Sequence, residues 1–599
     1  MLSRTNFPRL QCNLIFTNMK YLFIAEIFLI LATFTNSEDP QTYPVDIEYE
    51  PSLSGSPVAH LKNGILRGKI LNTPSGKKIY SYLGIRYAHP PTGTRRFKAP
   101  EELLEPWEGV KNAYFDGNKC PQLTFPERKF EGDEDCLFLN VYSSKIFEAE
   151  DVNQEKLSVF VFLHGGGFSH GSGLSEEYGP QHLLEHDMIL VVPNYRIGPF
   201  GFLTMGNGDL PLNLGLLDQQ MALKWVQRNI AAFGGDPNKV TLGGSNAGAV
   251  STHIHALTPS SHAISGNALT SWGTVELNEA KERALKLVDL LDCKRNVKDK
   301  NKSADPSTAA ILSCLSSADM DKIMWRAQFT IDLNTDFTFP FVPVIDSNNK
   351  EAIFLQQHPE ELMSSSSLAD IPWMMGVTSH EGLPHSLQVM VAPWVAEAFS
   401  ENFEENVPIF LGLQAKSREN LKEAGKRIRE FYSLNRGIGF GAIKDLAELF
   451  SDAFYFTTLM KTVKGYALKN ESPLYIYHFS YNYRKSKLAV GVPQGDDVGY
   501  LFPGNNTLHT FEPNTEEEEI AKRITRLVAS FVSSNKPTDA EAENFSWISA
   551  SKEEVSFLDI GRNYSILKGS DFHPKRLHLW EEIDRILQKE ISQDKKDEL

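Results

Sequence analysis

The sequence predicts an α/β fold, and three observations lead to this prediction. Two continuous apolar runs, LSVFVFL at 157–163 and MILVVPNY at 188–195, are typical of strands buried on both faces of a mixed or parallel sheet. The stretch at 216–233 has the composition and length of a helix. KVTLGGSNAGAVSTH at 239–253 contains a short β-branched strand, a glycine-rich turn and a helix-forming segment. Strands that alternate with helices indicate a layered fold with helices on both faces of a large, mostly parallel sheet.

Composition and charge agree with a globular protein that does not bind nucleic acid. Hydrophobic residues make up 41% of the 599 residues and charged residues 23%, which is enough apolar material for a large core. The formal net charge is −16, and no long Lys/Arg cluster is present. Such a chain is a poor partner for a phosphate backbone. We find no internal repeat and no low-complexity linker long enough to separate domains, and the length of the chain alone fits one very large α/β domain or several ordinary ones.

The N-terminus has the pattern of a secretory signal peptide. MKYLFIAEIFLILATFTNS, residues 19–37, begins with a positive charge, continues with an apolar stretch and ends in small residues, so cleavage after Ser37 is expected. The preceding residues lack this pattern, and Met19 is therefore a candidate for the true start. An uncleaved N-terminal anchor is the alternative. Residues 38–56 form a polar, proline-containing stretch that we interpret as a loose N-terminal arm.

The C-terminus ends in a second targeting signal. Lys596-Asp597-Glu598-Leu599 is the tetrapeptide by which a receptor retrieves proteins to the endoplasmic reticulum. An amphipathic helix is expected at 573–590, and residues 586–599 form the tail that presents the signal. No other apolar stretch reaches the roughly 18–20 residues that a membrane span needs. We therefore expect a protein of the endoplasmic reticulum lumen, with a retrieval receptor among its partners.

Cysteines and glycosylation sequences fit that compartment. Cys12 lies in the leader, and the four remaining cysteines permit three pairings, of which the two local loops, 120–136 and 293–314, are the simplest in an oxidising lumen. Free buried thiols are the alternative. Acceptor sequences for N-glycosylation begin at Asn301, Asn470, Asn505, Asn544 and Asn563.

A glycine-rich turn follows the first buried strand. His164-Gly165-Gly166-Gly167 comes directly after the run at 157–163. Consecutive glycines let backbone N–H groups approach a reacting oxygen, and this pattern is the usual oxyanion contribution of esterases and lipases. On its own it is equally typical of an ordinary turn. Together with a strand, sharp turn and helix downstream, it indicates an acyl-transfer site.

Four long motifs resemble the type-B carboxylesterase/cholinesterase family. They are EDCLFLNVY (134–142), VFLHGGGFSHGSG (161–173), NYRIGPFGFL (194–203) and NLGLLDQQMALKWVQRNIAAFGGDPNKVTL (213–242). The resemblance runs from about 57 to 585 and implies one large α/β-hydrolase domain. It also implies disulfides Cys120–Cys136 and Cys293–Cys314 and a salt bridge between Arg96 and Glu134. The family has a strand after the elbow helix that ends in Gln-Ser-Gly-Ser, whereas the corresponding stretch here, 258–272, is visibly shorter.

The family pattern Gly-Glu-Ser-Ala-Gly sets the register of the elbow. Counted from Gly235-Asp236-Pro237, it places Ser245 on the glutamate position and Asn246 on the position of the nucleophilic serine. Ala247 then supplies the third oxyanion donor beside Gly166 and Gly167. A register shifted by one residue would make Ser245 the nucleophile. That shift would re-aim the side chain and disturb the start of the helix.

The other two triad positions differ in the same way. GVTSHEG (376–382) places Glu381 on the acid position, whereas GVPQGDDVGYLF (491–502) places Gln494 on the position of the histidine base. A carboxamide nitrogen is delocalised and cannot form an acyl-enzyme, and a glutamine cannot accept and return a proton near neutral pH. Asparagine tolerates the positive φ of an elbow, and Gln494 has an amide N–H that could pair with Glu381.

Two functional hypotheses follow. In the first, the chain is a catalytically inactive member of the family that binds a small hydrophobic or ester ligand or a protein partner of the endoplasmic reticulum. In the second, it hydrolyses carboxylic esters with a non-standard nucleophile such as Ser245. No cofactor is implied. His164, His253, His255, His380 and His385 lack a metal-ligand spacing, so no metal site is expected.

Overall fold

The computed structural model describes most of the chain between residues 56 and 589. The stretches outside the description are 1–55, 125–126, 148–153, 207–209, 258–272, 294–307, 332–338, 347–353, 365–369, 392, 470, 484–489, 505–510, 544, 571 and 590–599. Both targeting signals, the shortened stretch 258–272 and the sequons at Asn301, Asn470, Asn505 and Asn544 therefore lie outside the described residues. The predictions made for them stay predictions.

Two sheets form the centre of the molecule. The first has the strand order β11-β9-β10-β8-β4-β3 and the second the order β14-β15-β16-β17. The strands of the first are β3 (Lys69–Asn72), β4 (Lys78–Arg86), β8 (Phe138–Ser143), β9 (Leu157–Leu163), β10 (Ile189–Pro193) and β11 (Gly235–Gly244). The strands of the second are β14 (Trp373–Thr378), β15 (Leu474–Phe479), β16 (Ser556–Ile560) and β17 (Tyr564–Lys568).

The sheets are more mixed than the sequence predicted. β9 pairs in parallel with β10 and β11, and β15 pairs in parallel with β14 and β16. The outer strands β3, β4, β8 and β17 pair antiparallel, because they are joined by connections without a crossover helix. Shorter strands make three further pairings. They are β1 (Val58–Leu61), β2 (Gly64–Arg67) and β5 (Val110–Asn112), then β6 (Gln122–Leu123) with β7 (Phe130–Glu131), and β12 (Val275–Glu276) with β13 (Val344–Ile345).

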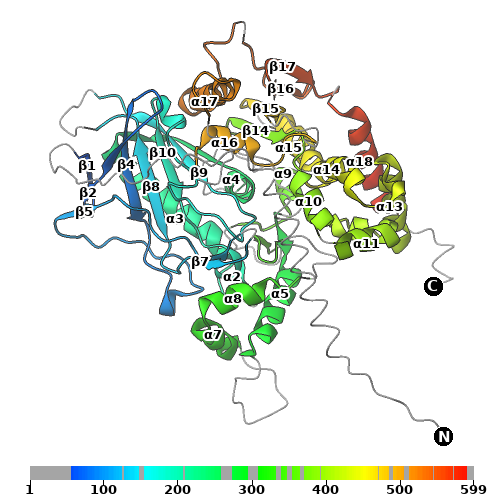
Figure 1. The fold of residues 1–599 in the computed structure, drawn as a ribbon. Helices are drawn as coiled ribbons and strands as arrows, with labels where there is room; N and C mark the ends of the chain where they lie inside the picture. The colour runs from blue at the N-terminus through cyan, green and yellow to red at the C-terminus, as the bar shows by residue number, and fades with distance from the viewer. Residues whose placement is uncertain are drawn as a thin grey trace, which may run out of the picture.

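Helices surround the two sheets (Figure 1). Those of the first half are α2 (Gly198–Phe202), α3 (Leu214–Asn229), α4 (Ala247–Ala256), α5 (Leu277–Leu290), α7 (Thr308–Ser317) and α8 (Met320–Ala327). Those of the second half are α9 (Pro359–Ser364), α10 (Leu383–Val391), α11 (Pro393–Glu401), α12 (Phe403–Phe410), α13 (Arg418–Phe431), α14 (Ile443–Ser451), α15 (Thr457–Lys469), α16 (Asp496–Leu501), α17 (Glu516–Ser534) and α18 (Pro574–Leu587).

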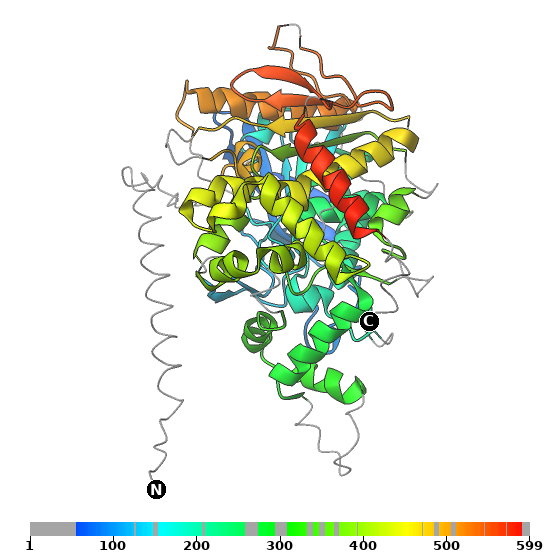
Figure 2. The same cartoon turned by 90° about the vertical axis from the view of Figure 1, so that its right-hand side faces the viewer.

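The two faces of the second sheet are covered by two different helices, α18 on one face and α17 on the other (Figure 2). Trp580 and Ile583 of α18 belong to one buried cluster with Phe557 of β16. Leu527 and Phe531 of α17 belong to another, together with alternate residues of β9, β15 and β16. This alternation is the period of two that a strand buried on both faces requires.

Several predictions from the sequence are confirmed. All seven residues of β9 are buried, and α18 falls within the predicted 573–590. Both disulfides, Cys120–Cys136 and Cys293–Cys314, are formed. Arg96 makes a two-pronged salt bridge with Glu134. In the described part of the chain, no helix is long and apolar enough to cross a bilayer.

The turn from β11 into α4 is held by very close packing. A Cβ atom added to Gly248 would lie 2.0 Å from the carbonyl oxygen of Leu163, at the end of β9. A Cβ on Gly244 would lie 2.5 Å from the backbone of Gly248. The first turn of α4 therefore rests directly on the backbone of the sheet. Only glycine at these two positions permits that contact, and it sets where residue 246 stands.

Gly248→Ala should destabilise the protein. The added methyl group would collide with the Leu163 carbonyl and push α4 off the sheet, at an expected cost of more than about 2 kcal/mol. Gly465→Ala is the matched control, because a Cβ at this helical glycine meets its nearest neighbour only at 4.0 Å. The control should be stabilised by roughly 0.5–1 kcal/mol. Urea unfolding measures both, and equal effects of the two substitutions would contradict this account of the turn.

Candidate active site

The turn after β9 directs two backbone N–H groups toward the start of α4. Gly166 and Gly167 have φ values of 106° and 58°, a conformation that glycine adopts without strain. The carbonyl oxygen of His164 accepts a hydrogen bond from the Tyr195 hydroxyl at 2.7 Å, which fixes the entry into the turn. These are the two N–H groups that the sequence analysis predicted as oxyanion donors, and that role stays a prediction.

Asn246 lies at the sharp turn between β11 and α4. Its backbone has φ 53° and ψ −119°, the strained conformation expected at an elbow. Its side-chain oxygen Oδ1 accepts three hydrogen bonds, from the N–H groups of Gly167 at 2.8 Å, Gly166 at 3.2 Å and Ala247 at 2.7 Å. The three predicted oxyanion donors thus converge on one point, and the protein's own carboxamide oxygen occupies that point.

Gln494 completes this arrangement from the segment before α16. The Asn246 Nδ2 group donates to Gln494 Oε1 at 2.9 Å. The orientation of Asn246 follows from its surroundings, since three N–H donors can only face the oxygen end of the carboxamide. The nitrogen end must then face Gln494. The structure therefore brings residues 246 and 494 together across 248 positions of sequence, as the sequence analysis predicted.

Glu381 lies just beyond β14 and is almost fully buried, with 2% exposure. Its Oε1 accepts a hydrogen bond from the backbone N–H of Thr378 at 2.7 Å. Burial and, after it, the nearby carboxylate of Asp497 raise the pKa of Glu381 to about 8, against smaller opposing effects of Thr378 and Gln494. The carboxyl group is thus mainly protonated at neutral pH, and no cationic side chain of the described residues is among the main causes of this shift.

The expected hydrogen bond between Gln494 and Glu381 is not formed. Within the described residues, Gln494 Nε2 and Glu381 Oε2 are both buried and have no hydrogen-bond partner. The oxygen end of the Gln494 amide accepts from Asn246, so its nitrogen end is the one directed toward Glu381. That nitrogen lowers the pKa of the carboxyl without reaching hydrogen-bond geometry.

Ser245 lies in different surroundings from Asn246. It borders a cavity beneath α17, together with Phe160 and Phe162 of β9. The described residues around that cavity include no histidine. A serine hydroxyl needs a neighbouring base to act as a nucleophile, and no histidine is among the described residues that line this cavity.

The histidines singled out from the sequence have structural contacts. His164 Nδ1 lies 2.9 Å from the Gly165 carbonyl oxygen, His380 Nδ1 lies 3.1 Å from the Ser379 hydroxyl, and His385 Nε2 lies 2.9 Å from the Tyr455 hydroxyl. His253 packs edge-on against Trp373, and His255 Nε2 lies 3.0 Å from the Gln219 side-chain oxygen. Burial lowers the pKa of His253 to about 3 and those of the other four to about 4. Among the described residues, no three of His, Cys, Asp and Glu form a group that would hold a metal ion.

Sequence reasoning missed how Asn246 uses the oxyanion donors. It predicted that asparagine would tolerate the elbow backbone, but not that its side chain would take the place of a substrate oxygen. The sequence did contain the parts of this arrangement. An asparagine oxygen, two bonds from Cβ, can accept hydrogen bonds from N–H groups that converge on it. Recognising it requires the distance between Gly167 and Asn246, which are 79 positions apart.

The glycine turn, the elbow and the buried acid after β14 define an α/β-hydrolase. The chain belongs to the carboxylesterase family, whose sequence profile matches residues 55–580.

Its relatives include insect esterases. The chain is 34% identical to Esterase FE4 of Myzus persicae over 536 residues, which covers 85% of this chain and 89% of the relative. It is 32% identical to Juvenile hormone esterase of Tribolium castaneum over 484 residues, or 76% of this chain and 79% of the relative. It is 29% identical to Venom carboxylesterase-6 of Apis mellifera over 517 residues, or 82% and 88% of the two chains.

Glu381→Gln should stabilise the protein at alkaline pH. Because the folded pKa of Glu381 is raised to about 8, above its unfolded value near 4.3, this residue favours folding below pH 4.3 and loses that contribution as pH rises through 8. The neutral glutamine avoids the loss. At pH 9 the variant should therefore exceed the natural protein by a few kcal/mol, with little difference at pH 4.5.

Thermal and urea unfolding across this pH range measure the difference between the two proteins. Glu423→Gln, at an exposed position on α13, is the matched control and should track the natural protein throughout. A constant offset of Glu381→Gln at every pH would mean that the carboxyl is ionised in the folded state.

Proposed function

We propose that this member of the carboxylesterase family does not hydrolyse esters and acts by binding, in the lumen of the endoplasmic reticulum. The observation that carries the proposal is the set of three hydrogen bonds to Asn246 Oδ1 from Gly166, Gly167 and Ala247. A substrate carbonyl needs these donors in order to develop negative charge. Here they are already engaged by the protein.

The chemistry of the two carboxamides supports the same conclusion. The Asn246 nitrogen is a donor with no usable lone pair, and Gln494 accepts from it through Oε1. No proton can pass along this pair near neutral pH, since neither group titrates there. Members of a catalytic set act as a unit, and loss of any one leaves roughly 10³–10⁴-fold acceleration over water.

Ester hydrolysis by Ser245 is the second candidate function. The names of the relatives, which are esterases, favour a hydrolase. The surroundings of Ser245 count against it, because the cavity that it borders is lined mainly by apolar side chains and by no described histidine. Asp497 is the acidic residue of that lining, and its Oδ2 already accepts a hydrogen bond from the Tyr477 hydroxyl at 2.8 Å.

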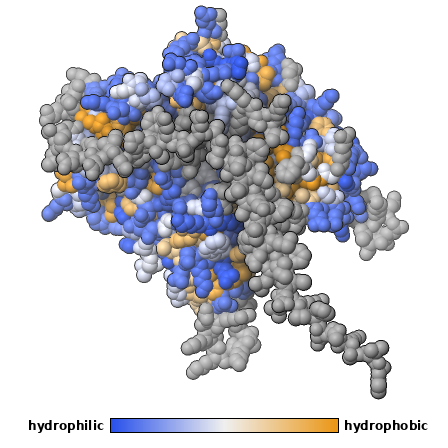
Figure 3. Space-filling view, viewed as in Figure 1, coloured by the Kyte–Doolittle hydropathy of each residue, from blue (hydrophilic) through white to orange (hydrophobic). Residues whose placement is uncertain are grey.

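The character of the surface favours a small ligand over a large apolar docking face. On the face shown in Figure 3, the coloured residues are mainly hydrophilic, and hydrophobic residues gather in several small areas. The exposed large apolar residues include Trp325 in α8, Phe329 after it, Phe431 at the end of α13 and Ile548 before β16. They come from distant parts of the chain. Scattered apolar residues are normal on a protein surface and define no binding face. A polar protein partner in the lumen remains part of the proposal.

The double variant Asn246→Ser, Gln494→His should gain esterase activity. Serine frees the three N–H donors, and histidine stands where it can take the hydroxyl proton and face Glu381. We expect turnover of p-nitrophenyl acetate at least about tenfold above that of the natural protein, since general-base catalysis contributes roughly 10²–10⁴-fold. The single variant Asn246→Ser should gain little, because it lacks a base.

Ser245→Ala, made in the natural protein and in the double variant, is the control for the second candidate function. It should change neither rate. A natural protein that hydrolyses the ester and loses that activity with Ser245→Ala would establish the hydrolase and overturn the proposal. Activity titrations at several enzyme concentrations separate a real signal from a contaminating esterase.

Removing the C-terminal signal should release the protein into the medium. In insect cells the natural chain should stay inside, because Lys596-Asp597-Glu598-Leu599 binds the retrieval receptor. The variant removes the signal by placing the same four residues in scrambled order, which preserves charge and length. This variant should be secreted. Immunoblots of cells and medium measure the distribution. Retention of both chains would show that another feature holds the protein in the cell.

A further inference from the structure

A partly open cavity of about 80 Å³ lies beneath α17, on the side of the sheets away from α18. Its wall is made mainly of aromatic and aliphatic side chains, among them Phe162, Phe479, Val528 and Phe531. No lysine, arginine or histidine of the described chain borders it. An interior normally packs at the density of an organic crystal, so an apolar space of this size is a feature that needs explanation.

The cavity lies where the two sheets end. Gly244 and Ser245 border it from the end of β11, and Met374 borders it from β14. In the described structure, β11 is the last strand of one sheet and β14 the first strand of the other. Ser245 also stands where the family pattern has the longer glutamate. A glycine and a serine at the end of β11 leave space that longer side chains would fill.

One polar group on the cavity wall has no partner in the described structure. Trp547 borders the cavity, is 6% exposed, and its indole N–H finds no hydrogen-bond acceptor. A buried donor without an acceptor is unfavourable, and a ligand oxygen or a water molecule would relieve it. The other polar pair is internally satisfied, since the Tyr477 hydroxyl donates to Asp497 Oδ2 at 2.8 Å.

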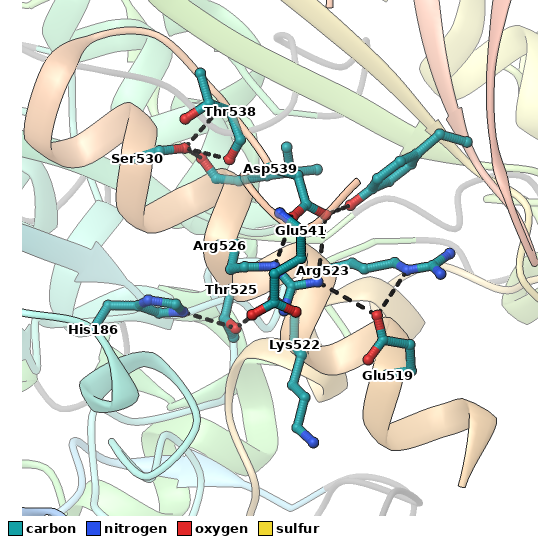
Figure 4. Close-up of polar contacts among 12 residues, drawn as sticks. His186, Glu519, Lys522, Arg523, Thr525, Arg526, Ser530, Thr538, Asp539 and Glu541 are labelled. Atoms are coloured by element: carbon teal, nitrogen blue, oxygen red, sulfur yellow. Dashed lines mark hydrogen bonds and ion pairs between the residues drawn. The ribbon is translucent and has the colours of Figure 1, made fainter. Parts of the chain in front are cut away.

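The wall formed by α17 and the segment after it is held rigidly from outside (Figure 4). The Nε group of Arg526, in α17, donates to Asp539 Oδ1 at 2.8 Å. The same guanidinium forms ion pairs with Glu519 and Glu541. Asp539 accepts a second bond from the Tyr564 hydroxyl at 2.9 Å. These contacts hold residues 538–541 against the outer side of α17. Trp547 follows this segment in the sequence. This part of the wall is therefore held in place before a ligand binds, which lowers the entropic cost of binding.

We infer that this cavity binds one end of an unbranched aliphatic molecule that carries a single uncharged acceptor oxygen, such as a ketone, an ether or an ester. The apolar wall selects the chain, and the Trp547 N–H selects the oxygen. A carboxylate is excluded, because the wall has no cation and contains Asp497. The space of about 80 Å³ admits the narrow end of an unbranched chain but not a rigid ring, since a cavity that takes a whole benzene measures about 150 Å³. This inference gives the ligand class for the binding role in the proposed function, but it does not depend on loss of catalysis.

Methyl propyl ketone is the test ligand, and cyclopentanone, with the same number of carbons and the same carbonyl, is its control. Ligand-observed NMR and thermal unfolding of the full chain should show millimolar binding of the linear ketone and at least tenfold weaker binding of the cyclic one. Pentane should bind more weakly than the linear ketone, since it offers no acceptor to Trp547.

Three variants locate the site. Val528→Phe fills the cavity from α17 and Ser245→Leu fills it from the elbow. Each should abolish binding while leaving the melting temperature equal or higher, because filling a cavity adds contacts. Trp547→Phe removes the donor and keeps a smaller aromatic side chain in the wall. It should weaken binding of the ketone roughly fivefold, the worth of about one neutral hydrogen bond, without weakening binding of pentane. Val110→Phe, at an exposed position on β5, is the matched control and should bind normally.

The opposite results would overturn the inference. They are absence of binding to the natural protein at saturating ketone, unchanged binding by both filled variants, or equal binding of the linear and cyclic ketones. Binding that responds to Asn246→Ser but not to Val528→Phe would place the ketone at the elbow instead. Ester hydrolysis by the natural protein would refute the proposed function alone, and the ketone titration would still decide the cavity.

Discussion

The candidate active site depends on the backbone of one strained residue. Gly244 and Gly248 bring α4 against the end of β9, and this contact leaves Asn246 with a positive φ and its side chain toward Gly166 and Gly167. The strain is opposed by three N–H donors that all end on one oxygen. In a hydrolase such donors are held ready for a charge that appears only during reaction. Here a neutral amide satisfies them permanently, so the geometry of a catalytic site becomes a source of stability for the turn.

The buried carboxyl of Glu381 has a physical role that does not depend on an ion pair. A glutamate beside an imidazolium is held ionised by that charge, whereas Glu381 is buried next to Asp497 and an uncharged amide. Its pKa of about 8 follows from that environment, and the protonated form removes the cost of a buried unpaired charge. Its hydrogen bond from Thr378 still closes the loop after β14. The residue thus has a structural use that does not require catalysis.

Features that depend on local sequence could be predicted, and those that depend on relative placement could not. The strand at 157–163, the helix within 573–590 and the pairing Cys120–Cys136 follow from composition, periodicity and family motifs, and the structure contains all three. The predicted hydrogen bond from Gln494 to Glu381 does not reach hydrogen-bond geometry, although the nitrogen end of the amide is directed toward that carboxyl, because an exact distance depends on packing that the sequence does not show. The cavity was not foreseen either. It arises from side chains of five strands and two helices whose packing no single segment reveals.

Two adjacent positions at the elbow have opposite consequences for ligand binding. Asn246 fills the space in which an ester carbonyl would lie, whereas Ser245 leaves space on the other side of the same turn. The oxyanion donors are polar and already satisfied, so a ligand gains little by displacing Asn246. The cavity beneath α17 is apolar and has an unsatisfied N–H, so a ligand with a chain and an oxygen gains both hydrophobic burial and a hydrogen bond there. Hydrophobic burial and the hydrogen bond to Trp547 together favour ligand binding in the cavity beneath α17 over ligand binding at the elbow.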